Sequence, residues 1–130
     1  MMNRRNVMGA GLALAATPAF AKDAKVTFQV PDGAADCHHH IYDARFPYNP
    51  NAVLKPPYAT VSDYKALQKK LGTSRNVMVQ PSTYGTDNSH YLTLLPQLGG
   101  KDRARMVGVV NTSVTDQELR QMHDAGVRDP

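Results

Sequence analysis

Strand patterns and capped helices alternate along this chain, and that alternation restricts its fold more than any other feature of the sequence. Three helices are predicted, each ended by a glycine: 61–71, 88–98 and 116–125. Strands are predicted at 34–41, 76–80 and 105–111, with a short leading strand at 26–30 and a further strand beginning at residue 127. A strand-and-helix unit of about 30 residues is typical of βαβ units. The sequence therefore predicts an α/β fold with a parallel sheet.

Two capping boxes support the helix boundaries. Thr60 precedes the first helix with Asp63 three residues on, and Thr115 stands in the same relation to Glu118 before the last helix. In such a box each side chain accepts a hydrogen bond from the backbone of the other residue, which satisfies N–H groups that the first helical turn leaves free.

Two further predictions concern the first helix and the middle helix. Tyr64, Leu67 and Leu71 are predicted to share one face of the first helix. Pro96 is expected to kink or shorten the middle helix, because proline has no N–H to donate.

The first 21 residues have the pattern of an export signal. Arg4 and Arg5 form a positive segment, an apolar run follows, and 19–21 offers a cleavage site of small residues. The run is too short to cross a bilayer, which takes about 20 apolar residues, and the arginine pair is typical of twin-arginine signals. We predict a signal over 1–21, a periplasmic or secreted location, no membrane span and a mature domain over 22–130. A frayed helix of a cytoplasmic protein is the alternative.

Charge and cysteine content argue against a nucleic-acid partner and against an intrachain disulfide. The formal net charge is +4, and it falls to +2 without Arg4 and Arg5, since no acid lies in the first 21 residues. The remaining charges are dispersed, so nucleic acid is not expected as a partner. Cys37 is the only cysteine, which rules out an intrachain disulfide.

A run of histidines marks the end of the first predicted core strand. In an extended strand, Asp36, His38 and His40 would share one face, while Cys37 and His39 would face the helices as core or structural residues. Imidazoles two residues apart are separated by about 6.5 Å at Cα, so both can converge on one metal ion or one carbonyl group. Asp36 either orients a histidine or pairs with a buried polar group.

Two loops are expected to join these histidines at one rim of the sheet. The stretch 42–59 is long and proline-rich, which favours a lid. Within it, Arg45 either meets an anionic substrate or is solvated. The polar loop 81–88 follows the second strand. The functional loops of parallel sheets gather at the carboxyl ends of the strands, so the rim is the predicted site.

These motifs resemble the amidohydrolase superfamily, and within it the branch of 2-pyrone-4,6-dicarboxylate lactonases, sugar lactonases and aromatic-acid decarboxylases. The residues that carry the resemblance are Asp36-x-His38-x-His40, Tyr42-Asp43, Phe46-Pro47-Tyr48, Gln80-Pro81-Ser82-x-x-Gly85-Thr86-Asp87-Asn88 and Ala125-Gly126-Val127-Arg128.

The resemblance implies a (β/α)8 TIM barrel in which an activated water opens the ring of a lactone or hydrolyses a similar ester. The substrate would be a small carboxylated or lactone molecule. His38 and His40 would be catalytic: they would either bind a divalent metal, such as zinc, or polarise the substrate carbonyl without a metal. Substrate-binding residues would be Ser82, with Tyr48, Thr86 and Asn88 as neighbours. A histidine from a middle strand and an aspartate from the last strand, the general base, would complete the site.

Chain length departs from that pattern. Such a barrel needs about 250 residues, whereas 109 follow position 21. We therefore expect an N-terminal part of a barrel, about three βα units, that lacks the general base, is inactive alone and self-associates through its uncovered sheet. His90 and His123 fall in predicted helices, where a barrel ligand would not lie.

Two other functions remain open at this point. One is a metal-dependent aromatic-acid decarboxylase or amidohydrolase of the same fold. The other is an exported, non-enzymatic metal-binding module that uses His38 and His40 with Cys37 or Asp43.

Overall fold

The computed structural model describes residues 27–129, so the predicted export signal lies outside the described residues. The elements follow in the order β1 (Ala35–His39), α1 (Val61–Leu71), β2 (Arg75–Val79), a 3-10 turn (Ser82–Tyr84), α2 (Ser89–Leu94), a second 3-10 turn (Leu95–Leu98), α3 (Gly100–Arg103), β3 (Ala104–Val107), α4 (Asp116–Ala125) and β4 (Val127–Asp129). Within the described range, no helix is long and apolar enough to cross a membrane.

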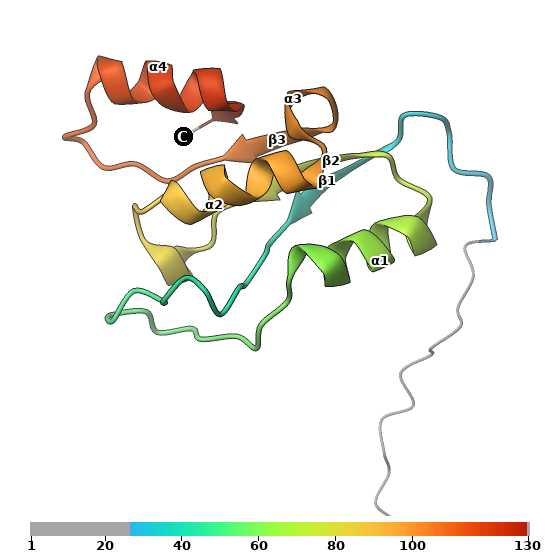
Figure 1. Cartoon of the computed structure of the whole chain (residues 1–130), viewed down its shortest axis with the longest axis horizontal. Coiled ribbons are helices and arrows are strands. Elements are labelled where there is room, and N and C mark those ends of the chain that lie inside the picture. Colours follow the sequence, from blue (N-terminus) through green and yellow to red (C-terminus); the bar gives the residue numbers. More distant parts are fainter. Residues whose placement is uncertain (1–26, 130) are drawn as a thin grey trace, which may run out of the picture.

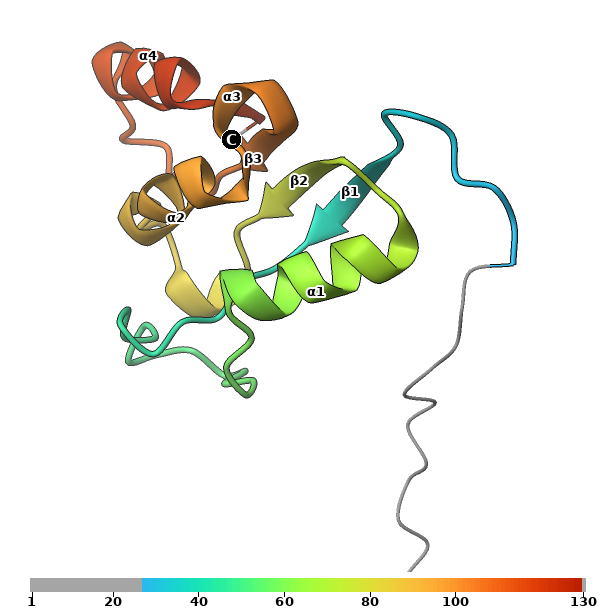
Figure 2. The same ribbon diagram turned by 45° about the vertical axis from the view of Figure 1, so that its right-hand side comes forward.

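The four strands form one parallel sheet in the order β1-β2-β3-β4, with α-helices in the connections (Figures 1 and 2). The α/β prediction is confirmed, including the strand that begins at Val127. The predicted leading strand at 26–30 is wrong, because residues 27–30, the described part of it, form no strand. That segment precedes the turn at Pro31 and no strand pairs with it, so a weak alternation of side chains is not enough to form a strand.

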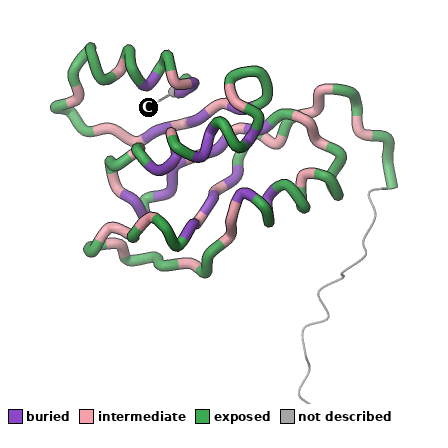
Figure 3. Tube along the Cα trace, viewed as in Figure 1, coloured by how far each residue is buried: buried purple, intermediate pink, exposed green. Residues whose placement is uncertain are grey.

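The helices cover one face of the sheet. On β2 and β3, Asn76, Met78, Ala104 and Met106 are buried, whereas the residues between them are only half-buried (Figure 3). Side chains alternate between the faces of a strand, so the half-buried positions mark a face that no described helix covers. In a closed βα barrel this second face would line the interior.

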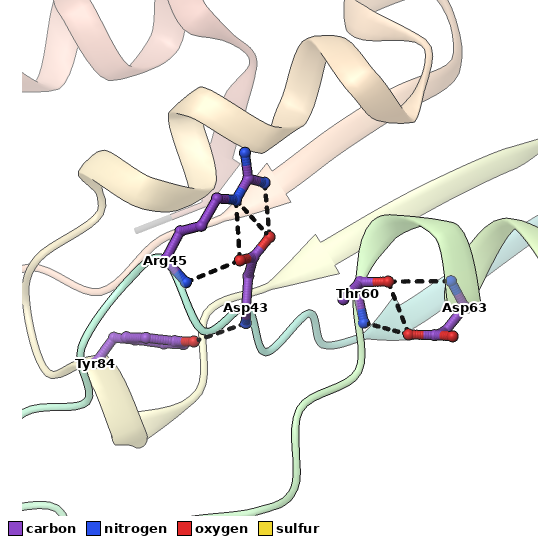
Figure 4. Close-up of polar contacts among 5 residues, drawn as sticks. All are labelled: Asp43, Arg45, Thr60, Asp63 and Tyr84. Carbon is purple, nitrogen blue, oxygen red and sulfur yellow. Dashed lines mark hydrogen bonds and ion pairs between the residues drawn. The ribbon is translucent and has the colours of Figure 1, made fainter.

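Both predicted capping boxes are present. Thr60 Oγ1 accepts from the Asp63 N–H, and Asp63 Oδ2 accepts from the Thr60 N–H at 2.8 Å (Figure 4). Thr115 and Glu118 make the same pair of bonds at the start of α4. These boxes fix where the two longest helices begin.

The three residues predicted to share a face of α1 differ in burial. Tyr64 is buried, but Leu67 and Leu71 are 49% and 37% exposed. The reason is the position of α1 at the β1 edge of the sheet (Figure 2). Because the sheet ends there, the side of α1 that carries the two leucines has nothing to pack against.

Pro96 shortens the middle helix as predicted, since α2 ends at Leu94 and a 3-10 turn carries the chain to Leu98. Gly99 then takes a left-handed conformation with φ of 104°. The short α3 that follows was not predicted, because two adjacent glycines are typical of a loop.

Candidate functional site

An extra residue in β1 decides which side chains face the site. Ala35 and Asp36 pair with Arg75 and Asn76, but the next Cα partners are His39 and Met78, so β1 advances three residues where β2 advances two. A bulge of this kind interrupts the alternation of faces. The sequence-based expectation that Asp36 shares a face with His38 and His40 is therefore wrong, because Asp36 faces α1.

Asp36 pairs with polar groups instead of lying beside the two imidazole rings. The Tyr64 hydroxyl donates to Asp36 Oδ2 at 3.1 Å, and the backbone N–H of His38 donates to Oδ1 at 3.1 Å. Burial, reinforced by the Asp36 charge, raises the pKa of Tyr64, so this hydroxyl stays a donor. Of the two alternatives for Asp36, pairing with a buried polar group is the one observed.

His39 lies in the helix layer, as predicted. Its ring stacks on Tyr64 with centroids 3.6 Å apart and planes 9° apart, and its Nε2 lies 3.0 Å from Asn76 Oδ1. The Asn76 amide nitrogen donates to the Leu98 carbonyl, so its oxygen faces His39 and Nε2 must carry the proton. Burial lowers the pKa of His39 and keeps the ring neutral.

Cys37 does not pack in the core, since its side chain is exposed. The predicted core position assumed regular alternation along β1. The register shift lies between Asp36 and His39, at Cys37 and His38, so the extra residue is found where the prediction placed a helix-facing cysteine.

His38 and His40 lie side by side. Their ring centroids are 5.0 Å apart and the rings meet edge to face at 86°. His40 Nδ1 lies 2.7 Å from the Val79 carbonyl oxygen. A carbonyl only accepts, so Nδ1 carries the proton and the Nε2 lone pair of a neutral His40 is left for a ligand.

This pair fits two positions of a metal centre and no more. Nε2 of a neutral imidazole is a common zinc ligand, and a hydrogen bond from the opposite ring nitrogen to a carbonyl is typical of metal-binding histidines. Zinc sites use at least three protein ligands. No group of three or more histidine, cysteine or acidic side chains within 27–129 is arranged to hold a metal ion.

Asp43 is tied to Arg45 just beyond the histidines (Figure 4). Arg45 donates through Nε at 3.0 Å and through its terminal nitrogen at 2.6 Å, and its backbone N–H donates to the same carboxylate at 3.0 Å. These hydrogen bonds with Arg45 lower the pKa of Asp43. The Asp43 N–H in turn donates to the Tyr84 hydroxyl at 3.4 Å, which joins the first loop to the turn after β2.

Tyr48 lies in the long loop, which is folded onto its surroundings. An antiparallel bridge between Tyr42 and Ala59 closes the loop, and the Tyr48 hydroxyl donates to the Pro56 carbonyl at 2.8 Å. The Tyr48 ring meets Tyr42 at 6.2 Å, and Tyr42 lies 6.1 Å from His40. Tyr42 thus lies between Tyr48 and His40.

The other predicted substrate residues are divided between two places. Ser82 is exposed and begins the turn after β2, three residues after the carbonyl that binds His40. Thr86 and Asn88 line a separate pocket against α4, and neither histidine contributes to it. The Asn88 amide is occupied there, since Nδ2 donates to the Val109 carbonyl at 2.8 Å and Oδ1 accepts from the Val109 N–H at 3.0 Å.

Sequence reasoning missed the residues that hold the site from behind. The Tyr91 hydroxyl donates to the Ile41 carbonyl at 2.8 Å and accepts from the Ile41 N–H at 3.2 Å, which fixes the backbone next to His40. Asn76 and Tyr64 hold His39. Their polar partners come from elements 28 to 50 residues away along the chain, and no local pattern predicts them.

The family model of the amidohydrolases matches residues 35–128, and the chain belongs to that family. The chain is 40% identical over 111 residues to the 2-pyrone-4,6-dicarboxylate hydrolase of Comamonas testosteroni. It is 36% identical over 112 residues to the 4-sulfomuconolactone hydrolase of Rhizobium radiobacter. These matches cover 84% and 83% of this chain but 36% of each relative, so the chain spans little more than a third of their length.

The fold of this chain is also similar to that of a solved structure. The crystal structure of a probable 2-pyrone-4,6-dicarboxylic acid hydrolase from Acinetobacter baumannii, with citric acid bound, matches with a TM-score of 0.67 and 28% identity. The match covers 73% of this chain and 35% of that chain. The described sheet and helices are thus part of an amidohydrolase TIM barrel.

Proposed function

We propose that this chain carries the first part of the active site of a lactone hydrolase. The observation that carries the proposal is the pair formed by His38 and His40, with rings 5.0 Å apart and with His40 Nδ1 bonded to Val79. The two relatives named above are hydrolases of a pyrone dicarboxylate and of a muconolactone. A small lactone that bears an acidic group is therefore the proposed class of substrate.

In this proposal the two imidazoles bind the lactone carbonyl at the rim. Attack by water turns the carbonyl oxygen into an oxyanion, and hydrogen-bond donors placed there lower the barrier. Because His40 Nδ1 is bonded to Val79, His40 would donate to this oxyanion through Nε2–H only as an imidazolium, whereas the neutral ring offers its Nε2 lone pair to a metal. His38 is exposed and His40 half-buried, so both rings can reach a substrate. If a divalent metal is bound by the two histidines, it supplies Lewis-acid stabilisation at the same position.

Ser82, Tyr48, Thr86 and Asn88 remain proposed substrate neighbours. Ser82 has the strongest structural support, because its turn follows the strand whose carbonyl binds His40. Tyr48 would contact the substrate from the folded loop. Asn88, with its amide bonded to Val109, would contribute by holding the two rim loops together.

The water-activating base is not proposed among the carboxylates next to the pair. Asp36 accepts from Tyr64 and His38, and Asp43 is paired with Arg45. Neither is free to take a proton from water. We expect the 130-residue chain alone to hydrolyse no lactone, with the base supplied by a later strand of the barrel.

A chimera tests the proposal directly. Residues 35–128 would replace the matching segment of the Comamonas testosteroni hydrolase, and hydrolysis of 2-pyrone-4,6-dicarboxylate would be measured. We expect activity that falls at least about 100-fold with His38→Ala or His40→Ala, the scale expected for loss of an oxyanion-stabilising group. His123→Ala, which removes an exposed histidine on α4, serves as the control. A folded chimera that hydrolyses no pyrone would contradict the proposal.

Metal analysis separates the remaining alternatives. A non-enzymatic binding module would retain stoichiometric zinc in the 130-residue chain, with a third ligand outside the described residues or recruited by rearrangement. Zinc-dependent loss of a carboxyl group from an aromatic acid in the chimera would instead favour the decarboxylase alternative. Export to the periplasm stays part of the proposal, and fractionation of cells that express the full chain tests it.

A further inference from the structure

His39, the middle residue of the run, makes the same kind of connection as His40 on the opposite face of β1. His40 Nδ1 donates to the Val79 carbonyl, and His39 Nε2 donates to Asn76 Oδ1, so both rings join β1 to β2. The two bonds measure 2.7 Å and 3.0 Å. One lies on the face toward the site and the other in the helix layer.

We propose that His39 and Asn76 are positioning residues that hold His40 with its proton on Nδ1 and its Nε2 free. The proposal rests on the proposed function only in treating His40 as a site residue. His39 and His40 are adjacent in the chain, so a rotation of the backbone that moves one ring must move the other. If the His39 ring leaves Asn76, the His40 ring loses its alignment with Val79.

The surroundings of His39 allow one orientation. Tyr64 covers its ring face at 3.6 Å, and the side chain is 8% exposed. Asn76 is itself 2% exposed and donates to the Leu98 carbonyl at 3.3 Å. The acceptor for His39 is therefore fixed by the chain segment between α2 and α3, and not by β1.

The unused ring nitrogen of His39 points to the same arrangement. Nδ1 of His39 is buried without a hydrogen-bond partner. The other tautomer would place its proton on this unpartnered Nδ1 and remove the donor to Asn76, which would leave two buried polar groups without partners. The neutral ring with its proton on Nε2 is the form that this site accepts.

The tautomer of His40 is the quantity to measure, because it needs no turnover. Long-range 1H–15N spectra of the full chain, recorded at alkaline pH where imidazoles are neutral, distinguish Nδ1–H from Nε2–H. We expect His40 to be in the Nδ1–H form. In His39→Leu and in Asn76→Ala, with helical circular dichroism retained, we expect Nε2–H to become the main form, as in a free histidine.

Matched variants separate positioning from general loosening. His39→Gln keeps a side-chain N–H that can reach Asn76 and should retain the Nδ1–H form of His40. His90→Leu makes the same change at another buried histidine, on α2, and should also leave His40 unchanged. If His39→Leu does not fold, Asn76→Ser, which removes the acceptor with a smaller change, is measured in the same way.

Two results would overturn the proposal. One is a folded His39→Leu or Asn76→Ser chain in which His40 keeps its proton on Nδ1. The other is an equal change of tautomer in His90→Leu, which would show that any loss of packing releases His40. An inactive chimera with the expected tautomers would contradict the proposed function alone, so the two failures are distinguishable.

Discussion

His40 Nδ1 lies 2.7 Å from the carbonyl oxygen of Val79, the last residue of β2. This bond joins the candidate site to the sheet, because the acceptor is a backbone atom of the neighbouring strand. Its length is in the range of a strong N–H···O bond. The orientation of the His40 ring is thus set by the pairing of β1 with β2, before any ligand binds.

The Tyr91 hydroxyl should stabilise the backbone beside His40. Tyr91 is fully buried, and its hydroxyl bonds both backbone groups of Ile41. We expect Tyr91→Phe to lower the free energy of unfolding by about 1–3 kcal/mol, because the Ile41 groups would lose their partner in a buried position. Urea denaturation of the full chain measures this. Tyr58→Phe, at an exposed tyrosine, should change it by less than about 0.5 kcal/mol.

Gly126 should be intolerant of any side chain. Its φ is 119°, and an added Cβ would lie 2.8 Å from Leu95 Cδ2. Gly126→Ala should therefore destabilise the chain by more than about 1 kcal/mol, since it combines backbone strain with a steric clash. Gly100→Ala is the comparison: its φ of 58° lies in the left-handed region that other residues can adopt, and no atom lies within 4 Å of the added Cβ. Equal losses in the two variants would contradict the predicted clash.

The sequence predicted the elements that depend on local chemistry. Thr60 and Thr115 each form a capping box with the acidic residue three positions on, which predicts where α1 and α4 begin. Pro96 shortens α2 because it has no N–H to donate. The parallel sheet follows from the alternation of such units. These features need only neighbours along the chain, so a single sequence is sufficient to find them.

The site could be predicted only in part. His38 and His40 are two residues apart at the end of β1, so their closeness could be expected from their spacing in the sequence. Asp36 and Cys37 were misplaced because the register shift in β1 arises in the pairing of β1 with β2, which no local pattern along the chain reveals. Thr86 and Asn88 belong to the same loop as Ser82 but turn toward α4, which only the folded path of the loop reveals.

His90 should make the chain less stable in mild acid. Burial lowers the pKa of this histidine from 6.5 to about 4, and its Nε2 has no hydrogen-bond partner. Because the folded pKa is below the unfolded pKa, the unfolded chain binds the proton first. The contribution of neutral His90 to the free energy of unfolding is fully present above about pH 6.5 and should be lost as the pH decreases toward 4.

A pH series of urea denaturation curves tests this dependence. In His90→Phe the fall in stability between pH 6.5 and 4 should be smaller than in the unaltered chain, by the share that His90 contributes. His39, whose pKa is also lowered by burial, should account for part of the remainder. An unchanged slope in His90→Phe would show that His90 titrates normally in the folded chain.

The uncovered face of the sheet should make the 130-residue chain associate with itself. Val77, Val79 and Val107 lie beside Arg105 on the half-buried face of β2 and β3, which is therefore mostly apolar, and β1 and β4 are the edges of the described sheet. Apolar faces and open strand edges of this kind promote association. We expect size-exclusion chromatography with light scattering to detect oligomers whose proportion rises with concentration. Val107→Lys places a charge on that face and should shift the chain toward monomer, because burying an unpaired charge in a contact is costly. Leu67→Lys, on the exposed side of α1, should not, and a monomeric unaltered chain would contradict the expectation.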